Sequence, residues 1–354
     1  MNKKFFLKSV VATSLLGLSG IAAAVCTTCT NNSNPVYANQ PNSNPGAFSQ
    51  TFSQTGLRTG GGISGLAGSF ASGAGGSGPR AGAESFEVKR YALTSEKGVA
   101  GAAASSQWNV WVATAYNKVA YGFAPLSSQG HVSTFVGGVD YTFDNNIVGG
   151  VAISYDNTSI GVNSGGNVTG TGYTVAPYIG IPITSNLAFD ATIGYGRTNI
   201  DTNLQAVVGS TSDDRTVGAL GLTYRENYDD WSFTGRASVL SVHDKLGSYT
   251  LSNGTFLAAG TVNVTQARVT GSAAYNMGQF SPYVGLSLVY DISAPDQAPV
   301  NGVAAANDRS AYVPTVGIRF KTDSAVYGNV QYSTEQGRSE VKNNQLLFNI
   351  GIRF

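Results

Sequence analysis

Apolar and polar residues alternate one by one along much of the C-terminal part of the chain. The clearest case is the terminal segment, in which one set of alternate positions is entirely apolar: Leu346, Phe348, Ile350, Ile352 and Phe354. Polar residues and Gly351 occupy the other set, with Leu347 as the one exception. Successive side chains of a strand point to opposite faces, so this segment predicts a strand with one apolar and one polar face. A strand of a water-soluble sandwich could alternate in the same way.

The same strand character recurs from Trp108 to the C-terminus. Twelve segments have it: about 108–118, 131–143, 147–156, 170–183, 187–198, 215–225, 231–241, 262–275, 280–290, 311–320, 325–333 and 343–354. Such a series of short amphipathic segments predicts an all-β domain over residues 108–354.

The lengths of the connections between these segments distinguish a barrel from a sandwich. Short, turn-like connections follow the even-numbered segments, at 144–146, 184–186, 227–230, 276–279 and 321–324. Longer polar connections follow odd-numbered segments, as at 157–169, 199–214 and 242–261. Outer-membrane barrels have short periplasmic turns and long outer loops, whereas a sandwich meets water at both ends. The pattern therefore predicts a 12-stranded antiparallel transmembrane outer-membrane β-barrel with both ends on the short-turn side.

Composition supports a membrane barrel. Charged residues make up 12% of the chain, about half the share typical of soluble domains, and there are 45 Gly. No stretch after residue 24 approaches the ~18 apolar residues that a membrane-spanning helix needs. The net charge of +1 argues against a nucleic-acid partner. With two His and two Cys, the chain is a poor candidate for a metal site, a cofactor site or a His-dependent enzyme.

The N-terminus has the pattern of a secretory signal. Lys3, Lys4 and Lys8 precede the apolar stretch 10–18, and small residues follow at 22–24. We expect residues 1–24 to direct export and to be removed after Ala24. Lipid modification of Cys26 is disfavoured, because Val25 is not the small residue that such processing requires. We instead expect Cys26 and Cys29 to form a local disulfide in an oxidising compartment.

Two further segments precede the predicted barrel. Residues 25–82 are rich in Gly, Ser and Asn and predict a disordered passenger or linker. Residues 83–107 predict a linker with a short helix, whose far end is weakened by Gly98 and Gly101.

Residues 83–354 resemble the translocator domain of autotransporters, the type V secretion proteins of Gram-negative bacteria. The resemblance rests on the twelve strands, on Trp108-Asn-Val-Trp111 at the first strand, and on the terminal Phe354. It implies a monomeric outer-membrane barrel with a helix in the pore and an upstream segment carried to the cell surface. The implied partners are outer-membrane lipid, the barrel-assembly machinery and periplasmic chaperones. It also implies that the assembly machinery reads four terminal residues: Phe348, Ile350, Ile352 and Phe354.

The chain departs from the usual form of that family in its short passenger region. Typical passengers have hundreds of residues, whereas 25–82 is a small segment. The paired Asn at which some relatives cut themselves inside the pore is missing near the predicted barrel start, so we expect an uncleaved chain. A stand-alone barrel with a structural, adhesive or pore role is the alternative, in which residues 25–82 stay in the periplasm or plug the pore.

Charged residues on the polar faces of the strands are expected to line the lumen. They are Asp140, Asp190, Arg236, Arg268, Arg319 and Arg353. Pairing that fills and rigidifies the lumen is the favoured interpretation over a selective water path, and Glu84, Glu87 or Glu96 of the pore segment could contribute. Asp213, Asp214 and Arg215 are expected to be solvated loop charges, and so are Asp308 and Arg309.

Two arrangements of His are candidate catalytic sites. His131 and Ser133 share one strand face, which could support a nucleophile and its base. His243-Asp244 and Asp229-Asp230 could form a carboxylate and His site, but the expected topology puts the two pairs at opposite ends of a strand. We therefore expect no enzyme activity.

Overall fold

The structure, a computed structural model, describes residues 107–122, 127–143, 147–162, 165–204, 207–293, 308–322 and 326–353. Its strands are β1 (Trp108–Tyr121), β2 (Ser128–Thr142), β3 (Val148–Val162), β4 (Asn167–Pro182), β5 (Leu187–Leu204), β6 (Val207–Tyr228), β7 (Trp231–Leu246), β8 (Tyr249–Thr250), β9 (Phe256–Leu257), β10 (Gly260–Tyr275), β11 (Phe280–Ser293), β12 (Ser310–Lys321), β13 (Val326–Glu335) and β14 (Val341–Arg353). The expected signal peptide, passenger, pore helix, Cys pair and Phe354 lie outside the described residues.

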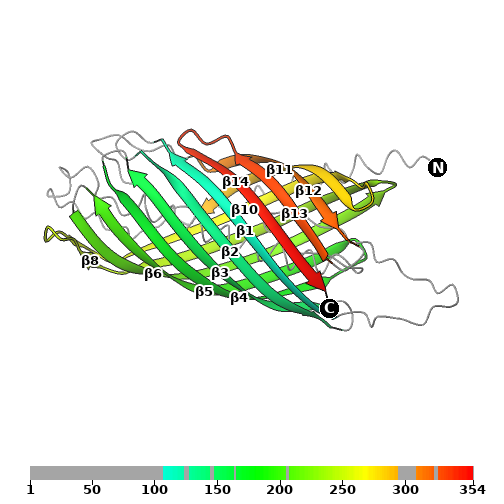
Figure 1. The fold of residues 1–354 in the computed structure, drawn as a ribbon, viewed down its shortest axis with the longest axis horizontal. Coiled ribbons are helices and arrows are strands. Elements are labelled where there is room, and N and C mark those ends of the chain that lie inside the picture. The colour runs from blue at the N-terminus through cyan, green and yellow to red at the C-terminus, as the bar shows by residue number, and fades with distance from the viewer. Residues whose placement is uncertain are drawn as a thin grey trace. The chain divides into compact units, whose positions relative to one another are not determined.

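All strands except β8 and β9 form one closed antiparallel barrel (Figure 1). Each barrel strand pairs with the next barrel strand along the chain, and β8 and β9 form a separate hairpin within the connection from β7 to β10. The last strand closes the barrel by pairing with the first, with Thr114 opposite Phe348 and Val110 opposite Ile352. The twelve-stranded antiparallel barrel predicted from the alternation is confirmed.

Closure gives the alternation a physical meaning, because every barrel strand has one face toward the lumen and one toward the outside. On β5 the odd-numbered residues face outward, as Ile193 shows with 63% of its surface exposed, while Asp190 and Thr192 on the even positions are buried. Leu347, the exception in the terminal pattern, is 1% exposed and faces inward. Apolar side chains thus cover the outside, and the inside carries most of the polar ones.

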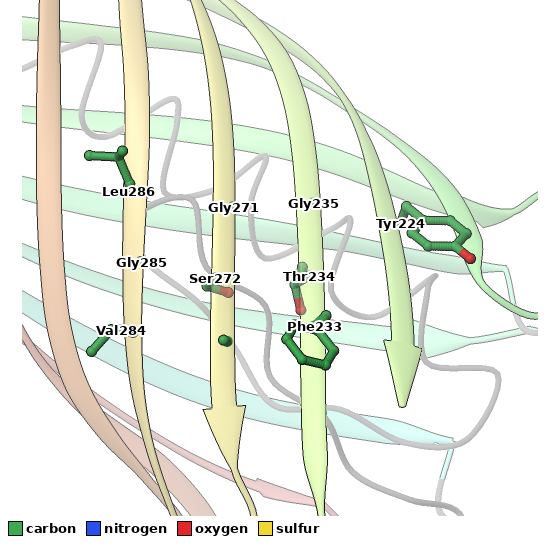
Figure 2. A pocket seen from close by; sticks show the side chains of 10 residues that line it. Tyr224, Phe233, Thr234, Gly235, Gly271, Ser272, Val284, Gly285 and Leu286 are labelled. Atoms are coloured by element: carbon green, nitrogen blue, oxygen red, sulfur yellow. The ribbon is translucent and has the colours of Figure 1, made fainter. Parts of the chain in front are cut away.

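Exposed aromatic side chains on the outside gather near the two ends of the barrel. On the short-turn side they are Trp108, Phe143, Trp231, Tyr228 and Phe280, and on the opposite side Tyr116, Tyr155, Tyr173, Tyr195, Tyr290 and Tyr312. Aromatic girdles at both interfaces are typical of barrels that span an outer membrane. One open hollow interrupts the apolar outer face between β6 and β11 (Figure 2).

The expected long connections are largely strand, which corrects the prediction made from their polarity. Only residues 163–166 separate β3 from β4, and only 205–206 separate β5 from β6, so most of 157–169 and 199–214 extends the barrel wall. In 242–261, β7 continues to Leu246 and the remainder holds the β8–β9 hairpin. On the outer face of these strand ends, Thr, Ser, Asn and Gly take the place of apolar residues, because this part of the wall lies past the aromatic girdle.

Candidate functional site: the lumen of the barrel

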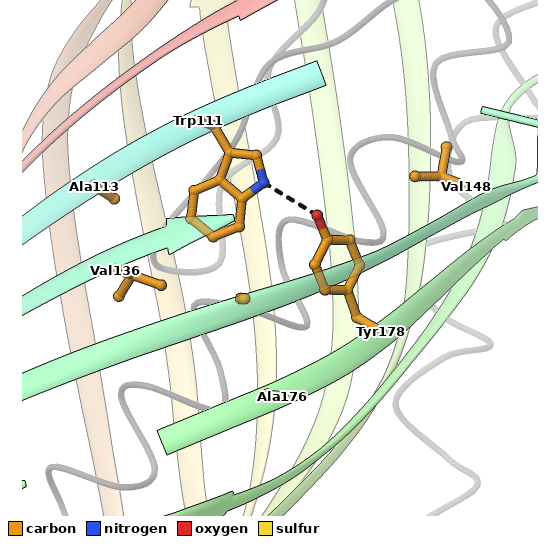
Figure 3. Packing of buried hydrophobic residues seen from close by; sticks show 7 residues of the cluster. Trp111, Ala113, Val136, Val148, Ala176 and Tyr178 are labelled. Atoms are coloured by element: carbon orange, nitrogen blue, oxygen red, sulfur yellow. Dashed lines mark hydrogen bonds between the residues drawn. The ribbon is translucent and has the colours of Figure 1, made fainter. Parts of the chain in front are cut away.

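A hydrogen-bonded cluster occupies the lumen near the short-turn end. Asp140 Oδ2 on β2 accepts a hydrogen bond from Tyr178 on β4 at 2.8 Å and one from Asn109 Nδ2 on β1 at 3.0 Å. Trp111 Nε1 donates to the Tyr178 hydroxyl oxygen at 3.1 Å, and Tyr327 on β13 donates to Asn109 Oδ1 at 2.6 Å. Figure 3 shows Trp111 and Tyr178 reaching toward each other inside the barrel. The cluster ties β1, β2, β4 and β13 together across the closing seam.

Each large aromatic ring in this part of the lumen lies over a glycine of the neighbouring strand. Trp111 is directly opposite Gly138, Tyr178 opposite Gly150, Tyr283 opposite Gly317 and Tyr327 opposite Gly351. A Cβ built on any of these four glycines would lie 2.0–2.5 Å from a ring or hydroxyl atom. The missing side chains therefore let the rings fold flat against the barrel wall, where aromatic cover also protects the glycine backbone.

Arg236 and Asp190 form a buried ion pair in the lumen, toward the short-turn ends of β7 and β5. The guanidinium donates from Nη1 to Oδ1 at 2.6 Å and from Nη2 to Oδ2 at 2.8 Å, and Nη1 also donates to Thr223 Oγ1 at 2.7 Å. Both charged side chains are at least nine-tenths buried. This two-point geometry matches the fork of Arg to the carboxylate, and it fixes the side chains as well as neutralising them.

Two further ion pairs lie toward the long-loop end. Arg215 on β6 donates to both carboxylate oxygens of Asp244 on β7, at 2.8 and 3.2 Å, with Asp213 Oδ2 3.6 Å away. Arg215 and Asp213 were expected as solvated loop charges, but both are buried in the lumen. The prediction was wrong because β6 continues through this polar run, so alternate residues turn inward while Asp214 faces outward.

The other pair joins the connection after β13 to the end of β11. Arg338 Nη1 lies 2.6 Å from Asp291 Oδ2, and its Nε lies 2.8 Å from Glu335 Oε1. Burial works against the charge on Arg338, but the hydrogen bond to Asp291 and the charge of Glu335 outweigh it and raise the pKa of this guanidinium. Nearby, Ser339 donates from its hydroxyl and its backbone N–H to Asp308, which lowers the pKa of that carboxyl.

The remaining charges expected to line the lumen are placed as follows. Arg319 is buried with its guanidinium carbon 4.3 Å from the centre of the Tyr283 ring, and Arg268 is half-buried on β10. Arg353 lies at the end of β14, and its side chain is outside the described part. Between the ion pairs, an apolar strip on β6, β7 and β10 faces inward and consists of Val217, Ala219, Leu240, Val242, Val262 and Val264. The lumen is thus divided into polar clusters and an apolar strip.

Comparison with known proteins places this barrel in a family. The sequence model described as the autotransporter β-domain matches residues 110–333 of the chain. The chain belongs to the autotransporter β-domain family. A search of proteins with curated functions found no match.

Solved autotransporter barrels share the fold. The translocator domain of the autotransporter NalP from Neisseria meningitidis has a TM-score of 0.61 at 14% identity, covering 70% of this chain and 89% of that one. The β-domain of the Bordetella autotransporter BrkA gives 0.60 at 14% identity over 70% of this chain and all of that one. The transport unit of AIDA-I from Escherichia coli gives 0.53 at 14% identity over 73% and 94%. This autotransporter β-domain is therefore an outer-membrane barrel of a secretion family.

The terminal strand of the autotransporter β-domain presents three of the four residues proposed as an assembly signal. Phe348 and Ile352 are exposed on the outer face and Ile350 is half-buried, while Phe354 lies outside the described part. Within the described ranges, no helix has the length and apolar character needed to cross a membrane.

The two candidate catalytic arrangements of His do not assemble in the described part of the autotransporter barrel. His131 stacks on Tyr116 on the outer face, with ring centres 5.7 Å apart. His243 faces outward, Asp244 is held inside by Arg215, and Asp229 lies in the turn at the far end of β7. Among all the residues that the structure describes, no group of three or more His, Cys, Asp or Glu is arranged to hold a metal ion.

Sequence reasoning missed several lumenal residues of this autotransporter domain. Trp111 was noted only within the motif that opens the first strand, and Tyr178 was not singled out, yet both are buried inside with polar partners. The signal that could have found them is strand parity, because Tyr178 is two and four residues from inward-facing Ala176 and Thr174, and Trp111 is two residues from inward-facing Asn109. Arg338 had no such signal, because it lies in a connection.

Proposed function

We propose that this autotransporter barrel presents its own short N-terminal segment at the cell surface. In this proposal residues 1–24 direct export and are removed, residues 25–82 pass through the barrel, and residues 83–107 remain in the lumen, as a short helix or linker. The chain stays uncleaved after export.

The observation that carries this proposal is Asn349 on the inward face of β14. Its side chain is fully buried, and neither its Nδ2 nor its Oδ1 has a hydrogen-bond partner among the described residues. A buried amide without partners costs about 1–3 kcal/mol, so a partner from the rest of the chain is expected. Residues 83–107 are the segment nearest in sequence to the barrel, and Glu84, Glu87 and Glu96 could contact the lumenal Arg268 and Arg319.

Assembly is proposed to follow the route of the family. Periplasmic chaperones would deliver the exported chain to the barrel-assembly machinery, which would read Phe348, Ile350, Ile352 and Phe354 on the last strand. Cys26 and Cys29 would form a local disulfide near the mature N-terminus. Removing Phe354 alone should lower the amount of folded barrel in membranes, and an unchanged amount would contradict this reading of the strand.

No catalytic step is proposed, and the barrel is proposed to act as a monomer. The absence of catalysis is supported by the outward position of both His rings and by the pairing of the lumenal Asp and Arg residues with each other.

An epitope tag near Gly46, probed by antibody and protease on intact cells, tests the proposal. Two further tags serve as controls: one at Asn253 in the β8–β9 hairpin, expected at the surface, and one in the turn at Asp229, expected in the periplasm. Access to the tag near Gly46 and at Asn253, but not at Asp229, is the expected result. If the Gly46 tag is reached only after the outer membrane is opened, the chain is instead a stand-alone barrel with a structural, adhesive or pore role.

A further inference from the structure

The outer face of the barrel contains a hollow built around two glycines. Gly235 on β7 and Gly271 on β10 are directly opposite each other, and a Cβ built on either would meet no atom within 4 Å. The hollow has a volume of about 580 Å³. In Figure 2, Phe233 lies on β7 close to Gly235, Tyr224 lies on one side of the strands that carry Gly235 and Gly271, and Val284 and Leu286 lie on the other side.

A polar group adjoins the hollow at its short-turn end. Glu226 on β6 is exposed and is directly opposite Phe233, whose ring borders the hollow. Its Oε2 accepts hydrogen bonds from the Tyr224 hydroxyl at 2.6 Å and from Asn186 Nδ2 at 3.1 Å. Both bonds end on Oε2, so these two partners orient the carboxylate, and among the described residues Oε1 is left available to a cation.

The membrane setting decides what can occupy this surface. Short turns of outer-membrane barrels face the periplasm, so the hollow opens toward the periplasmic half of the bilayer and Glu226 lies at headgroup level. Where water is absent, association depends on van der Waals packing, and small residues allow close approach. A recess floored by two glycines therefore offers an acyl chain more contact than the ridged wall around it.

We propose that the hollow holds one acyl chain of a phospholipid of the periplasmic leaflet whose headgroup carries an ammonium group, with that group bound by Glu226. The aromatic rings of Phe233 and Tyr224 border the chain, and Tyr224 links the apolar and polar parts of the site through its hydroxyl.

A second copy of the barrel fits this surface less well. Two barrels inserted in one membrane in the same orientation would be related by a two-fold axis along the membrane normal, which brings the same patch of each together. The two Glu226 carboxylates would then lie at the same depth near the contact, where like charges repel. A lipid ammonium in the place of the second barrel would instead attract the Glu226 carboxylate.

Lipid retention by the purified full chain tests the acyl-chain part of the site. Native mass spectrometry would compare phosphatidylethanolamine and phosphatidylglycerol with identical acyl chains. Filling the hollow with Gly235→Leu and Gly271→Leu together should reduce retained phosphatidylethanolamine by about threefold or more, because the recess is lost. Gly218→Leu is the matched control, since Gly218 also faces outward with nothing within 4 Å but does not border the hollow.

Folding of each variant would be checked by comparing the gel mobility of boiled and unboiled samples. If the double variant fails to fold, Gly271→Leu alone replaces it. Equal retention by the double variant and the wild type would overturn the proposal. So would a wild-type dimer in detergent that the same substitutions disperse, because the occupant would then be a second copy.

The headgroup part has a separate readout. Glu226→Gln should lower retention of phosphatidylethanolamine to the level of phosphatidylglycerol while leaving retention of the latter unchanged. If the wild type retains both lipids equally, the assignment of an ammonium headgroup is wrong.

Discussion

Arg236 on β7 reaches across β6 to bind Asp190 on β5 with two hydrogen bonds of 2.6 and 2.8 Å. The strand between them makes this possible through Gly221, which is directly opposite Asp190 and over which the guanidinium lies. The ion pair therefore joins three consecutive strands inside the barrel, in addition to the hydrogen bonds of the sheet.

Removing one partner of this pair should destabilise the barrel strongly. Asp190→Ala leaves the buried Arg236 without its carboxylate, and we expect a loss of about 3–5 kcal/mol in the free energy of unfolding. The double variant Asp190→Leu with Arg236→Met should lose less than the single variant, because no unpaired charge remains. Urea unfolding of the refolded barrel in lipid vesicles measures both. A double variant that is less stable than Asp190→Ala would contradict this account.

The glycine beneath the pair should be as important as the charges. A Cβ at position 221 would lie 2.2 Å from Arg236 Nη2, so Gly221→Ala must push the guanidinium out of its two-point geometry. We expect a cost of about 1–3 kcal/mol from the disturbed buried hydrogen bonds. Gly218→Ala on the same strand faces open space and should have little effect. In a protein that already carries Arg236→Met, Gly221→Ala should lower the free energy of unfolding very little. If the loss persists there, it comes from the backbone at Gly221 and not from the guanidinium.

The limits of the apolar band can be tested with one substitution at two heights on β5. Ile193 and Asn199 both face outward, but Ile193 lies below the girdle residue Tyr195 and Asn199 lies beyond it. Ile193→Arg should cost about 2–4 kcal/mol and reduce membrane assembly, since Arg would face the lipid interior. Asn199→Arg should be nearly neutral. Equal assembly of both variants, measured by the amount of folded barrel in membranes, would show that the band is misplaced.

The contact between Asp308 and Ser339 should weaken in acid. Hydrogen bonds from the Ser339 hydroxyl and backbone N–H lower the pKa of Asp308 in the folded state. Its contribution is therefore complete above the unfolded pKa of about 3.9 and is lost as the pH falls through the lower folded value. The protection of the Ser339 amide against hydrogen exchange, measured relative to the intrinsic exchange rate at each pH, should fall over that range. Asp308→Asn should remove this pH dependence, and an unchanged profile in that variant would assign it to another group.

The alternation of apolar and polar residues was sufficient to predict the barrel, because each strand residue of a closed barrel faces either the lumen or the outside. Once the parity of a strand is known, Asp190 and Arg236 are both assigned to the inside. Their pairing does not follow from parity, because it depends on the register of β5 and β7 against β6, which single-strand patterns do not contain. The residue between them, Gly221, is also ambiguous in sequence, since glycines occur on both faces of these strands.

The strand ends beyond the girdle were the least predictable part of the wall. Thr169, Asn199 and Asp201 lie on the outer face of strand ends whose outer residues are polar, while the inward face mixes Thr with a few apolar residues such as Val168 and Ile200. A pattern based on apolar residues cannot distinguish such a strand from a loop. For the same reason Arg215 was placed in solvent, although it is fully buried against Asp244.

The extension of β5 and β6 past Tyr195 affects what other molecules encounter at the cell surface. From Tyr195 to Leu204 the strand continues for a length of about 30 Å at the usual rise per residue. An antibody or phage that approaches these two strands would meet the edge of a hydrogen-bonded wall, because only residues 205–206 connect β5 to β6. Only alternate residues of that wall can vary to evade recognition, because the others hold the lumen together.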